Sequence, residues 1–351
     1  MARIIGLSTV TPQNKFAQPY LKQLAVEYFG RFIPRIERLA AVFDHAEIDT
    51  RYLVVNEEWW QREDRGFKER NDVYISEATV LLHRAVEKAL DQAGIAPQQV
   101  DNLIVVSSSG IATPSLDARV INTLKMRSNV RRTPIWGLGC AGGVAGLARA
   151  AEIARAHPHE ITVLAAVEAS SVTFLSDDVS KKNFIATALF ADGAAAVVLA
   201  GDERADAEGP EILDSMSTLW SDSLEVMGWN VVDSGLEVLF GVEIPRYAAD
   251  LFRPEVDCFL GKQGLQVKDI SEFVFHPGGA KVLEAFESSL QLPPGHLKAS
   301  REVLRGYGNM SSVTVLFVLD YILSNRPRRG SLGLASALGP GFSAEQLLIR
   351  F

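Results

Sequence analysis

The fold is decided at Trp136-Gly137-Leu138-Gly139-Cys140-Ala141-Gly142-Gly143-Val144-Ala145-Gly146-Leu147, which reads as the end of a strand, a sharp turn and the start of a helix. The turn places Cys140 at the first helical position, where free backbone N–H groups and the helix dipole favour a thiolate over a thiol. Such a cysteine is suited to act as a nucleophile. We expect Gly139, Gly142 and Gly143 to leave room for a bulky acyl thioester. The stretch alone equally allows a small buried hydrophobe at a tight junction.

The composition predicts a globular chain with a large core. The chain has 351 residues, 47% of them hydrophobic, which is enough for two core-bearing halves or one large domain. Its net charge of −8 argues against a nucleic-acid-binding surface. No apolar run approaches the length of a membrane span, and we expect a cytoplasmic protein. The two cysteines, Cys140 and Cys258, suit neither a disulfide framework nor a zinc site, and we interpret Cys258 as a packing residue.

Hydrophobic patterns along the chain predict alternating strands and helices. Continuous β-branched runs are typical of buried strands, and apolar residues at helical spacing indicate amphipathic helices. The strands are expected at residues 4–10, 103–107 and 161–167 and within 184–199, and the helices at 21–41 (interrupted by Pro34), 74–93, about 117–126 and 313–323. A charged, glycine-containing stretch at 201–210 is the best candidate for a boundary between an N-terminal half, residues 1–205, and a C-terminal half, 206–351.

The two halves carry a weak internal repeat. Residues 94–106 align without gaps on residues 264–276, 170 positions later, and both segments read as a helix end, a polar loop and a buried strand. At the same offset the turn at Cys140 falls on Met310, which also precedes an apolar helix. We therefore predict a duplicated α/β unit whose halves face one another, so that corresponding turns converge on one site.

This convergence brings three candidate catalytic residues together, namely Cys140, His276 at a strand end and Asn309 at a helix start. A histidine within hydrogen-bond reach could hold Cys140 as a thiolate–imidazolium pair. The Asn309 amide and a neutral His276 Nε2–H could stabilise the enolate that forms when a malonyl thioester loses carbon dioxide. Viewed singly, His276 could be an ordinary strand-end histidine and Asn309 a helix cap.

Five motifs together resemble the signature of the type III polyketide synthases, the chalcone and stilbene synthase family. They lie at residues 139–143, 189–196, 276–279 (His-Pro-Gly-Gly), 308–312 (Gly-Asn-Met-Ser-Ser) and 339–341. The resemblance implies a thiolase-like duplicated αβαβα sandwich of the α/β class and a homodimer. It makes Cys140 the acyl-carrying nucleophile, with His276 and Asn309 driving decarboxylation of malonyl-CoA. The partners would be acyl-CoA and malonyl-CoA, with no metal and no cofactor beyond these CoA thioesters.

The resemblance also assigns cavity residues. Phe190 matches the gatekeeping phenylalanine between the CoA tunnel and the inner cavity. Val238 replaces a second phenylalanine of the plant enzymes, which should widen the gate. Trp229 stands at a wall position that is glycine in chalcone synthases, and it should shorten the pocket. Thr113 matches a methionine that reaches into the partner subunit's cavity in plant enzymes.

Contacts to CoA are less well matched. Of three basic residues that bind CoA phosphates in plant enzymes, only Arg38 is retained, with Ala41 and His45 at the other two places. Thr173 and Ser311 complete the substrate-binding set that the resemblance implies. These differences from the plant enzymes are typical of bacterial members.

The cavity substitutions predict the substrate. Small residues at Val238 and Thr113 leave space, whereas Trp229 limits how far the polyketide can grow. An apolar passage for an aliphatic chain is expected near Ile111, Ala141 and Ala145. We therefore expect medium- or long-chain fatty acyl-CoA starters, extended by two or three malonyl units and cyclised to alkylpyrones or alkylresorcinol-type products.

Two alternatives remain from the sequence. The first is a 3-oxoacyl-ACP synthase III, which shares the Cys-His-Asn set and condenses once. That family would place a polar residue and an asparagine soon after the histidine, where this chain has Pro277-Gly278-Gly279. The second is a scaffold or binding subunit without activity, which the intact catalytic set disfavours.

Overall fold

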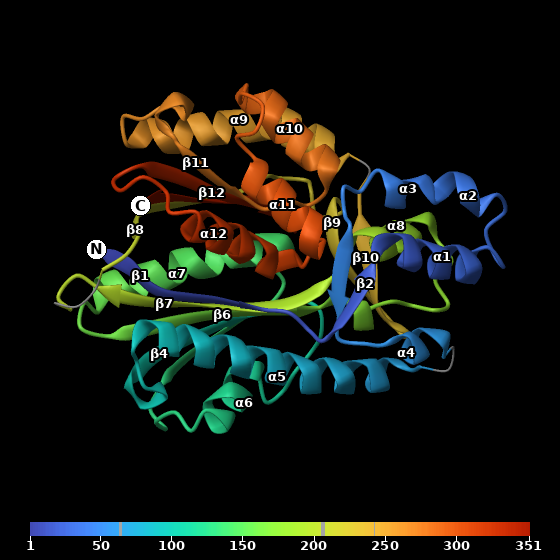
Figure 1. The fold of residues 1–351 in the computed structure, drawn as a ribbon, viewed down its shortest axis with the longest axis horizontal. Coiled ribbons are helices and arrows are strands. Elements are labelled where there is room, and N and C mark those ends of the chain that lie inside the picture. Colours follow the sequence, from blue (N-terminus) through green and yellow to red (C-terminus); the bar gives the residue numbers. More distant parts are fainter. Residues whose placement is uncertain (63–64, 205–207, 242) are drawn as a thin grey trace.

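The computed structural model describes residues 1–62, 65–204, 208–241 and 243–351, and it has five stacked layers (Figure 1). Two helices lie at the centre, α7 (Gly142–Ala156) and α12 (Thr314–Ser324). Strands lie on both sides of this pair. The outer layers are α5 (Phe67–Ala93) on one side and α9 (Ile244–Lys262) with α10 (Ala280–Leu290) on the other. The predicted αβαβα sandwich is confirmed.

Nine strands of the described chain form one sheet in the order β11-β12-β13-β8-β1-β7-β6-β4-β5. Both halves contribute strands in matching order, because β4, β6, β7 and β1 correspond to β11, β12, β13 and β8. Strand β1 pairs antiparallel with both β7 and β8, so it joins the two halves. The bounds are Ala2–Val10 (β1), Val100–Val106 (β4), Arg131–Ile135 (β5), Ile161–Ala169 (β6), Asp192–Gly201 (β7), Glu211–Leu219 (β8), Glu272–Phe275 (β11), Leu332–Gly339 (β12) and Ser343–Arg350 (β13).

Among the described residues, three hydrophobic clusters hold the layers together. The central cluster packs α7 and α12 between the inner faces of the strands, with Val144 and Leu316 among its buried side chains. The other two clusters lie under α5 and under α9 with α10. Helices therefore cover both faces of β6 and β7, and every residue of these two strands is buried, as continuous apolar runs predict.

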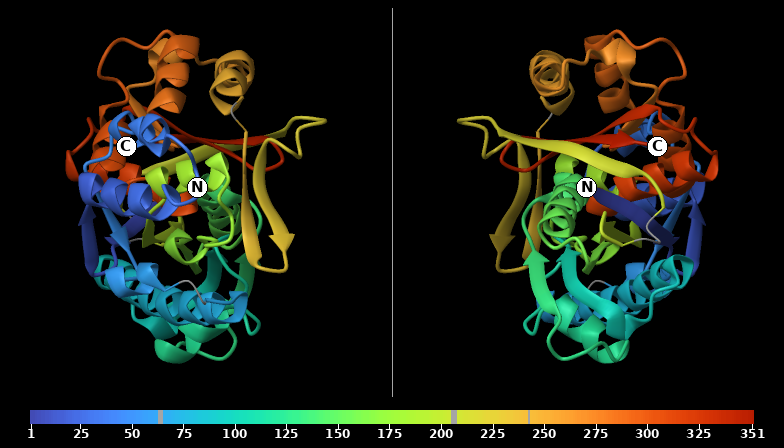
Figure 2. Two further views of the ribbon diagram at one scale, coloured as in Figure 1. Left: turned by 90° about the vertical axis from the view of Figure 1, so that its right-hand side faces the viewer. Right: turned by 90° about the vertical axis from the view of Figure 1, so that its left-hand side faces the viewer.

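Shorter elements gather at one end of the layers, where helix α1 and strand β2 lie beside helix α8 (Figure 1). The strands β9 and β10 form a separate hairpin at the side of the layers (Figure 2, yellow). The remaining bounds are Asn14–Ala17 (β2), Gln18–Phe29 (α1), Ile36–Leu39 (α2), Ala41–Asp44 (α3), Thr50–Leu53 (β3), Glu57–Gln61 (α4), Leu116–Thr123 (α6), Lys181–Leu189 (α8), Met227–Val232 (β9), Gly235–Phe240 (β10) and Lys298–Tyr307 (α11). Single 3₁₀ turns lie at Pro97–Gln99 (η1), Gly139–Ala141 (η2), Ser170–Val172 (η3), Val267–Asp269 (η4) and Ser311–Val313 (η5).

Some local predictions need correction. The helix expected over residues 21–41 is divided, because α1 ends at Phe29, α2 begins only at Ile36 after Pro34, and α3 starts at Ala41. The β9–β10 hairpin was not predicted. Cys258 is exposed on α9, so its interpretation as a packing residue is wrong. The predicted boundary between residues 205 and 206 lies outside the described residues. No helix in the described ranges is long and apolar enough to cross a membrane.

Candidate active site

The nucleophile turn follows strand β5 and leads directly into the central helix α7. Cys140 lies in the 3₁₀ turn η2, two residues before α7 begins, and its residue exposure is 7%. Gly139 has a φ of +46°, a left-handed conformation that glycine adopts at little cost. Cys140 therefore lies at the end of the central layer, slightly earlier than the predicted first helical position.

The glycines around Cys140 serve packing between the halves. A Cβ atom at Gly139 would lie 2.9 Å from Pro340 Cδ, and one at Gly143 would lie 2.1 Å from the Ser312 carbonyl oxygen. The expectation that they leave room for a thioester is wrong, because atoms of the chain itself fill these positions: mainly the second half at Gly139 and Gly143, and both Val106 and Ser312 at Gly142. Their small size instead lets the turns of the two halves meet at Cys140.

The backbone of Asn309 is paired with the segment that carries Phe190. The Asn309 N–H donates to the Leu189 carbonyl, and the Ala191 N–H donates to the Asn309 carbonyl, both at 2.9 Å. The Asn309 amide Nδ2 donates to the Gly278 carbonyl at 3.1 Å, and its Oδ1 accepts from the Ser311 N–H at 2.8 Å. These bonds fix the orientation of the amide in the site.

His276 follows β11 and lies buried with its ring nitrogens unpartnered. Neither Nδ1 nor Nε2 has a hydrogen-bond partner among the described residues. Burial lowers the pKa of the imidazole to about 3, so the ring is neutral near pH 7. A buried polar group without a partner is costly and rare in folded proteins. An incoming ligand with an acceptor would meet this unsatisfied donor.

The Cys140 thiol is also held neutral in this structure. Burial raises its pKa to about 11; hydrogen bonds with Ser311 and Asn309 act in the opposite direction, and the nearby Glu168 carboxylate raises the pKa further. Since the His276 nitrogens make no hydrogen bond within the described chain, the predicted thiolate–imidazolium pair is not formed here. The side chains whose hydrogen bonds lower the thiol pKa are those of Ser311 and Asn309.

Glu168 is a site residue that sequence reasoning missed. Its carboxylate is buried at the end of β6, where it accepts from Ser312 Oγ at 2.6 Å and from the Ser108 N–H at 3.0 Å. Ser108 Oγ in turn accepts from the Gly139 N–H at 3.1 Å. Burial raises the pKa of Glu168 to about 7. The signal was present in the sequence, because a lone acidic residue follows the apolar strand at residues 161–167.

Replacing Glu168 with glutamine should make Cys140 more reactive. Glutamine keeps an acceptor for Ser312 and Ser108 but removes the negative charge that opposes thiolate formation. We therefore expect the pKa of the Cys140 thiol to fall, because the carboxylate charge that raises it is gone. The rate of alkylation by iodoacetamide, measured between pH 6 and 10, should then rise several-fold above about pH 8, where Glu168 is ionised in the parent, and change little at pH 6, where Glu168 is already mostly protonated. An unchanged profile in Glu168→Gln would contradict the assigned influence of this carboxylate.

Cys140 faces a small cavity of about 40 Å³, which we call the catalytic chamber. Its lining combines polar groups next to the sulfur with apolar side chains from the β9–β10 hairpin. The lining residues include Glu168, Ser170, Phe190, Trp229, Val238, Phe240 and Ser311. The Phe190 and Phe240 rings meet edge to face at 6.4 Å between centroids.

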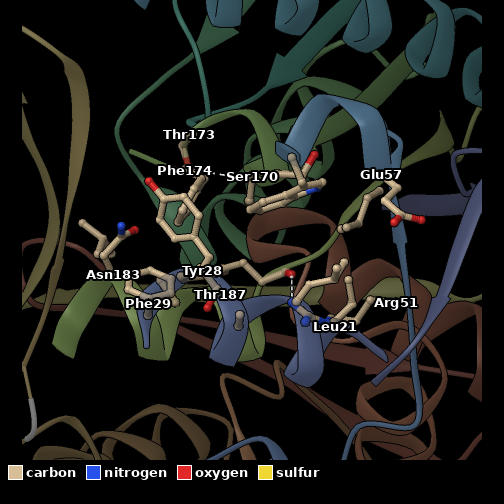
Figure 3. A pocket seen from close by; sticks show the side chains of 18 of the residues that line it. Leu21, Tyr28, Phe29, Arg51, Glu57, Ser170, Thr173, Phe174, Asn183 and Thr187 are labelled. Carbon is tan, nitrogen blue, oxygen red and sulfur yellow. Dashed lines mark hydrogen bonds between the residues drawn. The ribbon is translucent and has the colours of Figure 1, made fainter. Parts of the chain in front are cut away.

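A second cavity of about 330 Å³, which we call the large cavity, adjoins the catalytic chamber. The two share the side chains of four residues, Ser170, Phe190, Trp229 and Val238. The large cavity lies between α1, α4, α8 and β10, and apolar side chains make up much of its wall (Figure 3). They include Leu21, Leu24, Ala25, Phe29, Phe174 and Leu236. Its volume is in the range of small-molecule binding sites.

The predicted substrate-binding residues divide into two groups. Phe190, Trp229 and Val238 line both cavities, Thr173 lines the large cavity, and Ser311 lines the chamber. In contrast, Thr113 and Arg38 are exposed and line neither cavity of their own chain.

The predicted passage near Ile111, Ala141 and Ala145 is wrong. Ala141 and Ala145 are buried in packing, Ile111 is exposed, and none of the three lines either cavity. The larger space instead borders the catalytic chamber at Phe190, Ser170, Trp229 and Val238. No cluster of three or more His, Cys, Asp or Glu side chains suited to a metal occurs in the described part of the chain.

Comparisons with known proteins agree with this geometry. Family models described as the N-terminal and C-terminal domains of chalcone and stilbene synthases match residues 4–203 and 211–351. A Bacillus subtilis (strain 168) protein provisionally named a chalcone synthase is 39% identical, covering 100% of this chain and 99% of that protein. A 1,3,6,8-tetrahydroxynaphthalene synthase of Streptomyces peucetius subsp. caesius is 37% identical, covering 99% of this chain and 93% of that enzyme.

Comparison with solved structures points to the same family. The crystal structure of 1,3,6,8-tetrahydroxynaphthalene synthase from Streptomyces coelicolor A3(2), a bacterial type III polyketide synthase, superimposes with a TM-score of 0.94. The two sequences are 27% identical, and the match covers 99% of each chain. A thiolase-like sandwich with this site defines a condensing enzyme. The chain belongs to the chalcone and stilbene synthase family and is a type III polyketide synthase.

Proposed function

We propose that the protein loads a medium- or long-chain fatty acyl group from CoA onto Cys140. The sulfur attacks the thioester carbonyl while its proton passes to His276, and the bond to the CoA sulfur then breaks as His276 gives that proton to the departing sulfur, which releases free CoA and leaves the imidazole neutral. Burial holds the thiol and the imidazole neutral in the free enzyme. If the proton moves during the attack, the negative charge from the sulfur and the positive charge on the imidazolium would form together, and each would stabilise the other.

Extension then uses malonyl-CoA. The His276 Nε2–H and the Asn309 Nδ2–H would donate to the thioester carbonyl of malonyl-CoA while the bond to its carboxylate breaks and carbon dioxide leaves. The enolate carbon would attack the Cys140 thioester, which lengthens the chain by two carbons and frees the Cys140 sulfur. The unpartnered ring of His276 and the fixed orientation of the Asn309 amide support these roles.

The observation that carries the choice of starter is the large cavity beside the catalytic chamber. Its walls are largely apolar, and it meets the chamber at Phe190, where a chain attached to Cys140 could pass. Trp229 borders both spaces and would limit the number of extensions. We propose two or three malonyl units and cyclisation to alkylpyrone or alkylresorcinol-type products, in a homodimer that needs no cofactor besides CoA thioesters.

The starter proposal predicts that kcat/KM rises with acyl chain length from acetyl-CoA to dodecanoyl-CoA. Each buried methylene contributes about 0.8 kcal/mol, which is about fourfold in kcat/KM while the cavity has room. Product analysis by mass spectrometry with this series of starters measures both the profile and the number of extensions. A flat or falling profile, or a strong preference for an aromatic starter, would reject the proposal.

A matched pair of variants tests whether the acyl chain of the starter lies in the large cavity. Ala186 on α8 lines the large cavity, so Ala186→Phe should move the preferred starter to shorter chains while acetyl-CoA turnover stays within a few-fold of the parent. Ala156 is exposed at the end of α7 and lines neither cavity, so Ala156→Phe should leave the profile unchanged.

A further inference from the structure

One buried cation in the wall of the large cavity has no place in the proposed reaction. Arg51 lies on strand β3, is 3% exposed, and lines the cavity beside Leu21 (Figure 3). Asn183 and Phe29 line the cavity on the left of Figure 3, whereas Arg51 lies on the right. Glu27, Arg31 and Glu57 also line the cavity, but they are exposed or half-buried, whereas the charge of Arg51 is buried and costs free energy unless something compensates it.

Two of the Arg51 donors are used within the chain. Nε donates to Gln18 Oε1 at 2.9 Å, and Nη1 donates to the Phe190 carbonyl at 2.8 Å. Nη2 makes no hydrogen bond with any residue that the structure describes, although a guanidinium has five N–H donors. The Nη2 group of Arg51 is therefore the part of the guanidinium that can bind a ligand at the cavity wall.

Neutralisation of Arg51 inside the protein is incomplete. Asp192 is the carboxylate whose charge acts on it, but the Asp192 oxygens already accept from the Val54 N–H and from the N–H and hydroxyl of Ser171. Arg51 forms no ion pair with a described residue. Burial lowers its pKa to about 9, which leaves it protonated near pH 7.

Packing of the Arg51 stem and the hydrogen bonds of its guanidinium fix the position of the guanidinium. A Cβ atom at Gly308 would lie 2.8 Å from Arg51 Cγ, so the arginine stem packs directly on the backbone that precedes Asn309. The three consecutive carbonyls of the Phe190 segment are each bound from a distant part of the chain: Ala188 by Gln18, Leu189 by Asn309 and Phe190 by Arg51. The fork is thus rigid and pre-organised for a ligand.

We propose that Arg51 is an oxyanion-binding subsite of the large cavity, where Nη2 binds an anionic oxygen, enolate or carboxylate, carried by the aliphatic chain in the cavity. Arginine suits this role because its planar fork donates charge-assisted hydrogen bonds, which are about twice as strong as neutral ones. The apolar wall would hold the methylenes and Arg51 the oxygen. The subsite rests on the proposed function only in assigning that oxygen to a starter or to a growing polyketide.

Binding can be tested without turnover, because Trp60 and Trp229 line the large cavity and their fluorescence should respond to an occupant. The full-length protein is titrated at pH 7.5 with octanoate and with octan-1-ol, which have the same chain length but differ in charge. We expect octanoate to bind at least tenfold more tightly than octan-1-ol. Arg51→Met should abolish this preference while leaving the affinity for octan-1-ol within about threefold.

Two further variants make the result decisive. Arg31 is an exposed arginine of the same cavity lining, so Arg31→Met is the matched charge control and should keep the preference for octanoate. Arg51→Gln removes the charge but retains polar groups, and it serves if Arg51→Met does not fold. Equal binding of both probes by the parent protein, or an unchanged preference in the folded Arg51 variants, would overturn the subsite whether or not the starter profile is as proposed.

A turnover experiment separates the two sources of the oxygen. If the oxygen is a terminal carboxylate of the starter, octanedioyl mono-CoA should exceed octanoyl-CoA in kcat/KM, and Arg51→Met should remove the advantage. If it is an enolised oxygen of the growing chain, Arg51→Met should load octanoyl-CoA at the parent rate but release products with fewer extensions. A variant unaltered in both respects would contradict the proposal.

Discussion

Cys140→Ala is expected to lower condensation by more than about 10⁴-fold, because no other described residue that lines the catalytic chamber has a thiol to carry the acyl chain as a thioester. Product formation from acyl-CoA and malonyl-CoA is measured by mass spectrometry. In the parent protein, incubation with acyl-CoA alone should increase the protein mass by one acyl group, and this adduct should be absent from Cys140→Ala. Decarboxylation of malonyl-CoA should persist in the variant, since His276 and Asn309 remain.

The second cysteine provides the control. Cys258 is exposed on α9, far along the chain from the site, so Cys258→Ala should keep both the adduct and the product. Normal product formation by Cys140→Ala would show that the nucleophile has been assigned to the wrong residue.

Asn309→Ala should lower decarboxylation of malonyl-CoA by about 10² to 10³-fold, the usual cost of removing one oriented donor to a developing oxyanion. The expectation rests on the amide, which the Gly278 carbonyl and the Ser311 N–H hold in one orientation. Carbon dioxide release is the direct measurement. The hydrogen bond with Cys140 is lost as well, so the thiol pKa should rise and alkylation at neutral pH should slow by a few-fold.

The test compares the large loss of malonyl-CoA decarboxylation with the few-fold slowing of Cys140 alkylation in the same variant. Asn325 is an exposed asparagine at the end of α12, so Asn325→Ala serves as a matched control and should leave both rates unchanged. Full decarboxylation by Asn309→Ala would exclude the amide from enolate stabilisation. Equal losses in decarboxylation and alkylation would instead indicate a general disturbance of the chamber.

Much of the fold follows from local patterns in the sequence. The apolar runs at residues 103–107 and 161–167 identify buried strands because helices cover both faces of the sheet. The repeat predicted that turns from the two halves converge, and the Gly143 backbone does pack against the Ser312 carbonyl. Corresponding elements of a duplicated fold occupy equivalent places, so a weak repeat predicts the neighbours of Cys140.

The cavities could not be predicted in the same way, because they depend on which side chains meet across the fold. The large cavity takes its lining from α1, α4, α8 and β10, which are distant in sequence and share no motif. The charge environment of Cys140 likewise depends on Glu168, whose role appears only when β6 ends beside the nucleophile turn. The role predicted for Thr113, in the cavity of a partner subunit, depends on how two chains meet and stays a prediction.

The central position of β1 has a consequence for how the chain folds. Residues 2–10 are made long before their partners, which are β7 at residues 192–201 and β8 near residue 212. The first strand must therefore wait for more than half of the chain before it can pair, and such long-range pairing slows folding because loop closure precedes any gain from contacts. During synthesis this apolar segment would stay unpaired, which makes chaperone binding near the N-terminus valuable for this protein.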